Sequence, residues 1–355
     1  MSDLQPAAAD DNVIRVGTRK SPLAMAQAHI VVAALQAALP THRFPIDSMT
    51  TTGDRDQTTA LYNFGGKGLW TTQLEDKLVA DEVDVVVHSL KDMPTTLPDG
   101  LVLGCVTERH DPRDTLVIKQ SLADRHGWRT LADLPPGSVV GTSSVRRIAQ
   151  LARRYPHLAF RDHRGNINTR LAKLDAEDSP LAAIILAAAG LQRMDFGHRI
   201  SQFLDADGAG VLHAVGQGAL GVECRAGDAR VLAALAKLRH EPTALACTAE
   251  RSLMRALEGG CSVPIGVETA WLEGEDGSRR LRMRATVVAV KGDKAVDADE
   301  TEVVASEAEA DEFGKRIASD LVARGADAIL DAINADKAVQ AEQAEQAAQA
   351  GQPSQ

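Results

Sequence analysis

Arginine is concentrated in one stretch of this sequence, between positions 141 and 170. With one aspartate and no lysine, the stretch has a formal charge of +6, although the whole chain carries −10, which leaves −16 for the remainder. The planar guanidinium group forms paired hydrogen bonds with carboxylates and phosphates. The cluster therefore predicts a pocket for a polyanion, with a solvated helix face as the alternative for Arg153 and Arg154. Its seven members are Arg146, Arg147, Arg153, Arg154, Arg161, Arg164 and Arg170.

Cys261 is a candidate reactive thiol. It lies in the segment Gly259-Gly-Cys-Ser-Val-Pro, where two glycines precede a predicted strand. A thiol on such a loop can be exposed and alkylated, whereas most free cysteines are buried and inert, so the residues alone leave both interpretations open. The other three cysteines lie in apolar segments and are predicted to be structural: Cys105, Cys224 and Cys247.

Asp92 is a candidate acid–base or electrostatic group. It follows the apolar run Val83-Asp-Val-Val-Val-His-Ser and is next to Lys91. Ligand-binding groups in α/β sheets gather at the carboxyl ends of the strands. A carboxylate at that place can transfer protons or stabilise a cation. A surface ion pair is the alternative.

Several common kinds of site are not predicted. The histidines at positions 88, 110 and 213 lack metal-ligand spacing, and the four cysteines contain no C-x-x-C pair. We therefore expect no metal site and no disulfide framework, and the isolated cysteines suit a reducing cytoplasm. The segment Gly65-Gly-Lys-Gly is too short for a phosphate-binding loop of ATP-binding proteins.

The composition limits the class of protein. A length of 355 residues predicts two or three domains, and 44% hydrophobic with 25% charged residues is ordinary for globular chains. A charge of −10 with 3% aromatic residues argues against nucleic-acid binding. No apolar run reaches about 18 residues, so no membrane span is expected. The acidic residues 1–12 resemble neither a secretory signal nor a transit peptide.

Strand and helix patterns alternate around these candidate residues. A strand over 13–17 leads to Ser21 and Pro22, an N-cap and a first-turn proline, and to a helix that ends near residue 39. A helix N-terminus that follows a strand favours anion binding, and Arg19 and Lys20 lie beside it. Residues 69–81 predict a helix, and residues 83–89 predict a buried strand that leads to Lys91.

The same alternation is repeated further along the chain. It predicts strands over 138–141, 158–161 and 182–188, and helices over 145–155 and 167–174, the first capped near Thr142 and Ser144. We therefore expect two α/β lobes with mostly parallel sheets, near 13–108 and 113–211. The polar, proline-containing segment between them is typical of a hinge.

The last third has a different pattern. Helices are predicted over 241–258 and 307–331, and strands over 263–272, 280–290 and 295–304, separated by turn residues. This indicates a small α+β domain over about 241–333. Residues 335–355 are rich in Ala and Gln, and we expect both this tail and residues 1–12 to be disordered.

Eight motifs, taken together, give the chain a specific resemblance. From about Ile14 to about Ile333, the sequence resembles the porphobilinogen deaminase (hydroxymethylbilane synthase) family. The motifs occur in the family's order: Thr18-Arg-Lys-Ser-Pro-Leu-Ala, Gly65-Gly-Lys-Gly-Leu, Val87-His-Ser-Leu-Lys-Asp-Met-Pro, Gly141-Thr-Ser-Ser-Val-Arg-Arg, Arg164-Gly-Asn-Ile-Asn-Thr-Arg-Leu, Ala189-Gly-Leu, Gln217-Gly-Ala-Leu-Gly and Gly259-Gly-Cys-Ser-Val-Pro-Ile-Gly.

The resemblance implies a transferase of tetrapyrrole (haem) biosynthesis. It condenses four porphobilinogen molecules head to tail into hydroxymethylbilane and releases four ammonia, on a dipyrromethane cofactor that it makes from its own substrate. The resemblance implies a thioether between this cofactor and Cys261, and makes Asp92 the catalytic carboxylate. Separately, we expect a cytoplasmic monomer without metal, nucleic-acid or membrane partners.

The resemblance implies roles for further residues. Those expected to bind the cofactor are Lys91, Thr142, Ser144, Arg146, Arg147 and Arg170. Those expected to bind the incoming substrate or the growing chain are Arg19, Ser21, Gln27, Lys67, Trp70, Arg164, Gly165 and Arg193. Position 70 departs from the family, which usually has Phe there, and the indole is expected to keep a face for stacking on a pyrrole.

The implied fold consists of two lobes like type II periplasmic binding proteins and a small α+β C-terminal domain that carries Cys261. Residues 217 to about 238 are implied to return to the first lobe. One alternative function is a non-enzymatic, two-lobed anion-binding protein, which would need neither the third domain nor Cys261. A second is a thiol acyltransferase, which would require a histidine base that no motif supplies.

Overall fold

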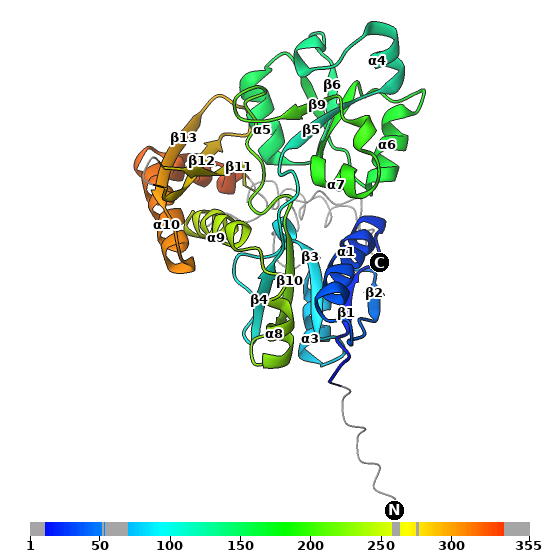
Figure 1. Cartoon of the computed structure of the whole chain (residues 1–355). Helices are drawn as coiled ribbons and strands as arrows, with labels where there is room; N and C mark the ends of the chain where they lie inside the picture. The colour runs from blue at the N-terminus through cyan, green and yellow to red at the C-terminus, as the bar shows by residue number, and fades with distance from the viewer. Residues whose placement is uncertain (1–10, 52, 54–69, 258–262, 275–276, 337–355) are drawn as a thin grey trace, which may run out of the picture.

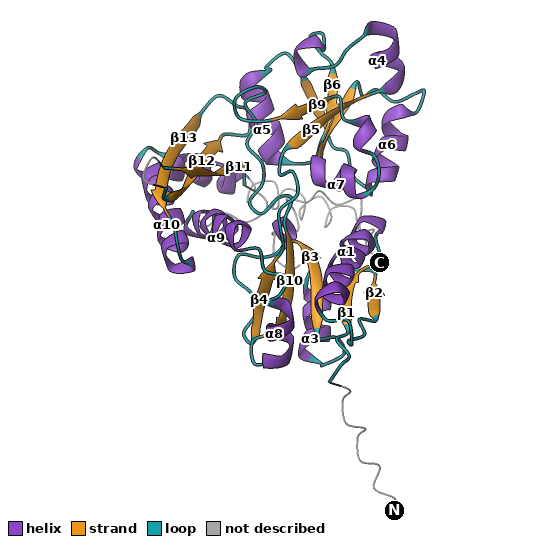
Figure 2. Ribbon diagram, in the orientation of Figure 1, coloured by secondary structure: helices purple, strands orange, loops and turns teal. Residues whose placement is uncertain are grey.

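The computed structural model describes residues 11–51, 53, 70–257, 263–274 and 277–336. Its elements form three regions (Figures 1 and 2). Lobe 1, at the bottom of Figure 1, holds β1–β4 and β10, lobe 2, at the top, holds β5–β9, and the third region, at the side, holds β11–β13.

Lobe 1 has a sheet with the strand order β2-β1-β3-β10-β4. Side chains of β3 alternate between its two faces: Val85 and Val87 pack with α1 and α8, whereas Val86 packs with α3. This is the two-residue period of a strand covered on both sides. The elements are β1 (Val16–Arg19), β2 (Ile46–Met49), β3 (Val85–Ser89), β4 (Leu101–Val106), β10 (Leu220–Arg225), α1 (Pro22–Ala38), α3 (Thr72–Val79) and α8 (Ala229–Leu235).

Lobe 2 repeats this arrangement with the order β7-β6-β8-β5-β9. Helices α4 and α5 contribute to the hydrophobic cluster on one face of the sheet, and α6 and α7 to the cluster on the other. The elements are β5 (Asp114–Ile118), β6 (Val139–Gly141), β7 (Ala159–Arg161), β8 (Ala183–Ala187), β9 (Gln202–Leu204), α4 (Gln120–His126), α5 (Val145–Arg154), α6 (Ile167–Asp175) and α7 (Ala188–Arg193).

Each sheet contains one strand that opposes its neighbours. β10 is antiparallel to β3 and β4, and β5 is antiparallel to β8 and β9, while the remaining pairs, β1–β2, β1–β3, β6–β7 and β6–β8, are parallel. The expectation of mostly parallel sheets therefore missed one strand in each lobe. These are the first strands formed after the chain crosses from the other lobe, so they start at the edge where the parallel strands end.

The third region is a three-stranded antiparallel sheet against two helices. Its elements are β11 (Ile265–Glu273), β12 (Arg279–Val288), β13 (Ala295–Val303), α9 (Glu241–Ala256) and α10 (Glu307–Ala323). The backbones of α9 and α10 pack closely at Gly314, where a Cβ would lie 2.2 Å from the carbonyl oxygen of Ala249. The helix expected over 307–331 is interrupted: α10 ends at Ala323, Gly325 has φ 97°, and residues 326–336 form a further helical segment.

The structure confirms the expected α/β class, with two α/β lobes and a small α+β region. β10 and α8, from the segment after residue 217, lie in lobe 1 as the resemblance implied. The domain boundaries remain predictions. Most of the two segments predicted to be disordered, 1–12 and 335–355, lies outside the described residues.

A buried ion pair joins the hinge to the third region. Both terminal nitrogens of Arg109 donate to the Glu250 carboxylate, over 2.6 and 3.0 Å, and Nε donates to the Gln217 carbonyl oxygen over 2.7 Å. Glu250 also accepts from the Gly216 backbone N–H over 2.8 Å and from the Thr269 hydroxyl over 2.6 Å. Burial opposes ionisation of Glu250, but Arg109 outweighs it and lowers the pKa of this carboxyl to about 2.

His213 lies in the same junction and is held neutral. It is 2% exposed, and the backbone N–H of Val267 donates to its carbonyl oxygen over 2.9 Å, which joins the segment between β9 and β10 to β11. Nδ1 lies 3.0 Å from the Ala214 carbonyl oxygen, and Nε2 has no partner among the described residues. Burial and the nearby Arg109 lower the pKa of His213 to about 4.

The first prediction concerns acid stability. An unfolded histidine takes up a proton below a pKa of about 6.5, whereas folded His213 resists protonation until about pH 4, so the folded state loses stability as the pH falls through this window. The His213 contribution should be about 2 kcal/mol between pH 7 and pH 5. Urea unfolding of His213→Asn at the two pH values should show a correspondingly smaller loss than the wild type. His29→Asn, on the exposed side of α1, is the control, and equal pH dependence of all three proteins would contradict the prediction.

Candidate functional site

The predicted site residues come together where the two lobes face each other. Arg19 ends β1, and the short 3-10 helix η2 (Leu90–Asp92) follows β3 directly. In lobe 2, Thr142 and Ser144 follow β6, and Arg193 ends α7 after β8. These are the carboxyl ends of parallel strands, where α/β sheets bind ligands. The lobes also approach each other here, since a Cβ at Gly190 of α7 would lie 3.8 Å from Leu23 of α1.

A chain of polar contacts connects the two lobes at this place. Lys91 Nζ donates to Gln217 Oε1 over 3.2 Å. Gln217 Nε2 in turn donates to Asp114 Oδ1 over 2.9 Å and to the Pro112 carbonyl oxygen over 2.7 Å. The Gln217 amide thus uses both its donor and its acceptor to join η2 of lobe 1 to the first residue of β5 in lobe 2.

Asp114 is buried between two arginines. Arg146 donates to Oδ2 over 2.7 Å, and Arg147 donates to Oδ1 over 2.7 Å from a terminal nitrogen and over 3.1 Å from Nε. The carboxylate is 0% exposed, and both guanidinium groups are buried as well. Burial opposes ionisation, but the two cations hold the pKa of Asp114 far below its usual range. The three residues therefore carry a net charge of +1.

Asp114 lies among the predicted site residues, and the sequence analysis did not single it out. Arg146 and Arg147 were expected to hold carboxylates of a cofactor, and each is already paired with Asp114. Their side chains also donate to the carbonyl oxygens of Leu212 and Ile185, respectively. The only signal in the sequence was an acidic residue immediately before the apolar run 115–118, because Asp114 and Arg146 are 32 positions apart.

Further cations surround Asp92. Burial, together with Arg147 and Arg146, lowers the pKa of Lys91 to about 8, although Asp92 acts in the opposite direction. Burial, Arg147 and Arg164 lower the pKa of Arg170 to about 10, again against Asp92. Positive charge thus exceeds negative charge around this carboxylate, and an added anion would be stabilised there.

Arg193 of α7 and Arg170 of α6 add donors to the same region. One terminal nitrogen of Arg193 donates to the Gly218 carbonyl oxygen over 2.7 Å, while its buried Nε has no partner among the described residues. Burial lowers the pKa of Arg193 to about 10. Arg170 Nε donates to the Gly165 carbonyl oxygen over 2.7 Å, and Gly165 has φ 120°, which favours glycine. An unmatched buried N–H is costly without a ligand to accept from it.

The lobe 1 residues predicted to bind substrate occupy the start of α1 and its surroundings. Ser21 caps α1 through its hydroxyl, which accepts from the Ala24 backbone N–H over 3.4 Å. Gln27 is buried, and its amide donates to and accepts from the Ser89 hydroxyl of β3, over 2.9 and 3.1 Å. The Arg19 guanidinium lies over the Trp70 ring. In lobe 2, the Thr142 hydroxyl accepts from the Ser144 backbone N–H over 3.3 Å, and the Ser144 hydroxyl caps α5.

Not every arginine of the cluster lies at this site. Arg153 is exposed and pairs with Asp297 of β13 over 3.0 and 2.9 Å, and Arg154 is exposed too. The alternative prediction, that these two arginines lie on a solvated helix face, is therefore confirmed. Lys67 and Cys261 lie outside the described residues. The other cysteines are buried, and burial raises their thiol pKa values, in agreement with a structural role: Cys105 to about 12, Cys224 to about 11 and Cys247 to about 12.

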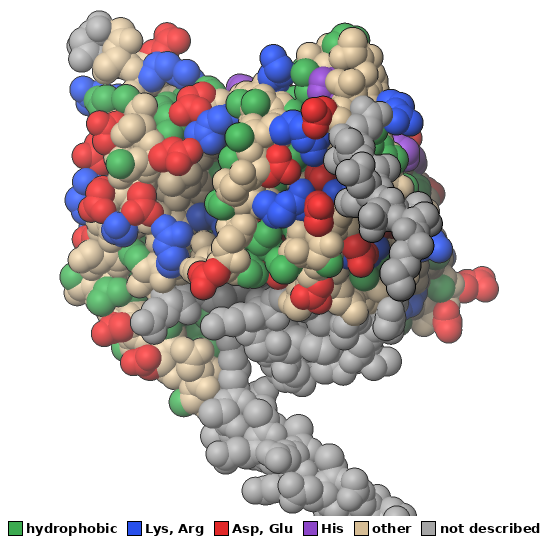
Figure 3. Space-filling view, turned by 90° about the horizontal axis from the view of Figure 1, so that it is seen from below, with side chains coloured by type: hydrophobic (Ala, Val, Ile, Leu, Met, Phe, Trp, Pro, Cys, Tyr) green, Lys and Arg blue, Asp and Glu red, His purple; other side chains and the backbone are tan. Residues whose placement is uncertain are grey.

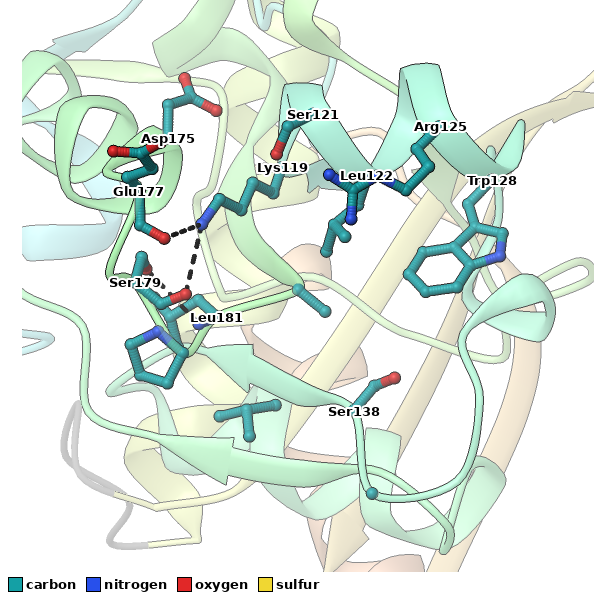
Figure 4. A pocket seen from close by; sticks show the side chains of 14 residues that line it. Lys119, Ser121, Leu122, Arg125, Trp128, Ser138, Asp175, Glu177, Ser179 and Leu181 are labelled. Atoms are coloured by element: carbon teal, nitrogen blue, oxygen red, sulfur yellow. Dashed lines mark hydrogen bonds between the residues drawn. The ribbon is translucent and has the colours of Figure 1, made fainter.

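A separate concavity of about 550 Å³ lies at the opposite end of the lobe 2 sheet, at the beginnings of β6 and β8 (Figure 4). Lys119 points into its wall, but Nζ already donates to the carbonyl oxygens of Ala176, Glu177 and Ser179, over 2.7, 3.4 and 3.3 Å. Its ammonium group therefore holds the loop after α6. None of the predicted site residues lines this concavity.

Other kinds of site are not supported by the described part of the chain. No group of three or more His, Cys, Asp or Glu residues with a metal-binding arrangement occurs within it. None of its helices is both long enough and apolar enough to span a membrane. On the face seen in Figure 3, the visible acidic and basic side chains are interspersed, so the described surface there offers no broad basic patch to a polyanion.

Comparisons with known proteins identify the family of this chain. Residues 14–233 match the family model "Porphobilinogen deaminase, dipyromethane cofactor binding domain", and residues 244–323 match "Porphobilinogen deaminase, C-terminal domain". The chain belongs to the porphobilinogen deaminase family. Porphobilinogen deaminase of Neurospora crassa is 53% identical over 92% of this chain and 95% of that protein. The protein of that name from Synechococcus elongatus is 50% identical over 91% and 96% of the two chains.

A solved structure of similar architecture is the periplasmic aliphatic sulphonate binding protein SsuA from Escherichia coli. It has a TM-score of 0.36 and 14% identity, over 70% of this chain and 71% of that chain. The family membership decides between the functions considered above: it supports the enzyme rather than the anion receptor or the acyltransferase.

The residues present fit the dipyrromethane cofactor of the porphobilinogen deaminase family. Each of its two pyrrole rings carries an acetate and a propionate, so the group is a tetra-anion. The lobe interface supplies the matching excess of cations, with lowered pKa values at Lys91, Arg170 and Arg193 and an unmatched buried N–H at Arg193. Such groups gain stability when carboxylates bind.

The second prediction compares two aspartates that each pair with arginine. Asp114→Asn would leave two buried guanidinium groups without an anion, which typically costs about 3–5 kcal/mol. Asp297→Asn removes the exposed partner of Arg153, which should cost at most about 1 kcal/mol. Urea unfolding of both variants measures the difference, and equal losses would show that Asp114 does not act as a buried anion.

Proposed function

We propose that this chain performs the family's reaction with Asp92 as its catalytic carboxylate. In that reaction four porphobilinogen molecules are joined head to tail into hydroxymethylbilane, and each condensation breaks a C–N bond, releases ammonia and forms a C–C bond. The observation that carries the proposal is the position of Asp92. It lies at the lobe interface, at the end of η2, within the electrostatic reach of Lys91 and Arg170.

The surrounding cations would bind the carboxylates of the reactants. Lys91, Thr142, Ser144, Arg146, Arg147 and Arg170 would hold the cofactor. The Asp114 network supports this assignment, because one carboxylate shared by two guanidinium groups leaves positive charge for a ligand. Arg19, Ser21, Gln27, Lys67, Trp70, Arg164, Gly165 and Arg193 would hold the incoming substrate or the growing chain.

When bound, the dipyrromethane supplies the nucleophilic pyrrole carbon to which the first substrate unit is joined. The contribution of Asp92 is electrostatic. Loss of ammonia from porphobilinogen leaves a cation that is conjugated over the pyrrole ring, and its N–H becomes more acidic. A fixed carboxylate stabilises that charge more than it stabilises the neutral substrate, and this differential stabilisation accelerates the step. The same carboxylate can assist removal of the proton after the C–C bond forms.

We also propose a thioether at Cys261, a monomeric state and a cytoplasmic location. The described cysteines support a reducing compartment, since all three are buried free thiols. The contacts between Lys91, Gln217 and Asp114 support a monomer, because the site residues come from both lobes of one chain.

The third prediction concerns the attachment of the cofactor. Purified Cys261→Ala should lack the dipyrrole mass increment and should release no ammonia from porphobilinogen, because the carbon–sulfur bond cannot form. Intact-mass spectrometry measures the increment directly. Cys247→Ala is the matched control: Cys247 is buried in α9, so its replacement should affect stability alone. Retention of the increment by Cys261→Ala would refute the assignment.

The fourth prediction concerns Asp92. Asp92→Asn keeps the shape and one acceptor oxygen but loses the charge, so turnover should fall at least about a hundredfold while the protein stays folded. Asp92→Glu keeps the charge but displaces it by one methylene. It should retain weak activity and accumulate species with added pyrrole units, visible in the intact mass.

The measurement is ammonia release by protein that circular dichroism shows to be folded. If Asp92 formed only a surface ion pair, worth about 0–1 kcal/mol, Asp92→Asn would keep most of its turnover. Near-normal ammonia release would therefore exclude a catalytic role for Asp92.

A further inference from the structure

Trp70 makes a contact that the sequence analysis did not anticipate. The guanidinium carbon of Arg19 lies 3.9 Å from the centroid of the Trp70 ring. Arg19 ends β1, and Trp70 lies just before α3, so the contact joins positions 51 residues apart. The distance is well within the range of cation–π attraction, and indole is the strongest partner among the aromatic side chains.

The indole is also fixed in place by Gly53. A Cβ at that position would lie 2.4 Å from two carbon atoms of the Trp70 ring, Cε3 and Cζ3. Only a residue without a side chain allows the ring to lie so close to this backbone. Trp70 is half-buried, so the ring is packed against protein rather than free to rotate in solvent.

A fixed ring restricts the arginine that lies on it. An arginine side chain has many rotamers, and it loses this freedom when it binds an anion in one geometry. Stacking on Trp70 removes part of that freedom beforehand. Arg19 lies two residues before Ser21, the N-cap of the 17-residue helix α1, at the edge of lobe 1 that faces lobe 2.

We propose that Trp70 is a positioning residue that holds the Arg19 guanidinium ready to bind a carboxylate of the incoming porphobilinogen. The proposal rests on the function proposed above. In this proposal the indole does not stack on a pyrrole, as expected from the sequence, but acts through Arg19. Trp70 therefore affects the binding of porphobilinogen more than the rate of the chemical step.

The third region offers a matched control. Arg279 lies over the Trp271 ring, with 4.9 Å to the centroid, and the Trp271 indole N–H donates to the Pro242 carbonyl oxygen over 3.0 Å. This pair has the same chemistry on β11 and β12, away from the strand ends that carry the site. Substitutions there report the general effect of losing a cation–π contact.

The first experiment tests the contact without substrate. The sequence has three tryptophans, so the double substitution Trp128→Phe and Trp271→Phe leaves Trp70 as the only tryptophan, and its fluorescence can be recorded alone. In this background Arg19→Leu should change the intensity or the maximum of the emission, and Arg279→Leu should not. Unchanged emission after Arg19→Leu would overturn the proposal.

The second experiment tests the role with porphobilinogen as the probe. Trp70→Leu should raise KM about fivefold, with less than a twofold change in kcat, and Trp70→Phe should restore most of the loss. In an Arg19→Leu protein, Trp70→Leu should have no further effect on KM, because the two residues act as a unit. Trp271→Leu should leave KM unchanged.

The outcomes separate this inference from the proposed function. Additive effects of the Arg19 and Trp70 substitutions on KM would show that Trp70 does not act through Arg19, with the deaminase activity itself intact. Should Trp70→Leu fail to fold, the same comparison is made with Trp70→Met, which also removes the aromatic ring, and additivity again refutes the proposal. A wild-type protein that releases no ammonia from porphobilinogen would refute the proposed function, and the substrate role of Trp70 with it, even if the emission result showed the contact.

Discussion

The buried carboxylate of Asp114 is the charge on which the arrangement of the two lobes depends. Three side chains donate to it, Arg146 and Arg147 of α5 and Gln217, which precedes β10. Without this anion, two buried guanidinium groups would repel each other, and Gln217 would lose a partner that fixes its amide towards Lys91. Together, Asp114, Arg146 and Arg147 carry a net charge of +1. The anion allows the two arginines to remain buried, and the remaining positive charge can still attract an acidic ligand.

The direction of the strands explains why this charge lies at the site. Strands that end at the edge facing the other lobe deliver η2, the start of α5 and α7 to one region. The two opposing strands, β5 and β10, begin at that edge, so Asp114 and the segment before Leu220 are brought there too. Because the parallel strands end and the opposing strands begin at the same edge, this edge receives both the cationic residues and the groups that neutralise part of their charge.

The sequence predicted the helices and the strands with strong local signals, such as α1 with its Ser21 cap and the apolar run of β3. It missed the strands β2, β4, β5, β9 and β10 and the short helices α4, α7 and α8, whose place depends on partners far away in the chain. Asp92 and the arginine cluster were found because motifs and charge patterns are local. The pairing of Asp114 with Arg146 and the stacking of Arg19 on Trp70 were not, because only the folded topology brings these residues together.

The position of β10 has a consequence for synthesis on the ribosome. β10 lies between β3 and β4, yet it is made after the whole of lobe 2. Until residue 225 has left the exit tunnel, β3 has an unpaired edge, β4 has no partner strand, and the hydrophobic cluster of lobe 1 lacks Leu220, Val222 and Cys224. Lobe 2 contains all five of its strands earlier, in one uninterrupted segment. We therefore expect the second lobe to fold first on the nascent chain, and the N-terminal lobe to be the part that needs protection from aggregation in the meantime.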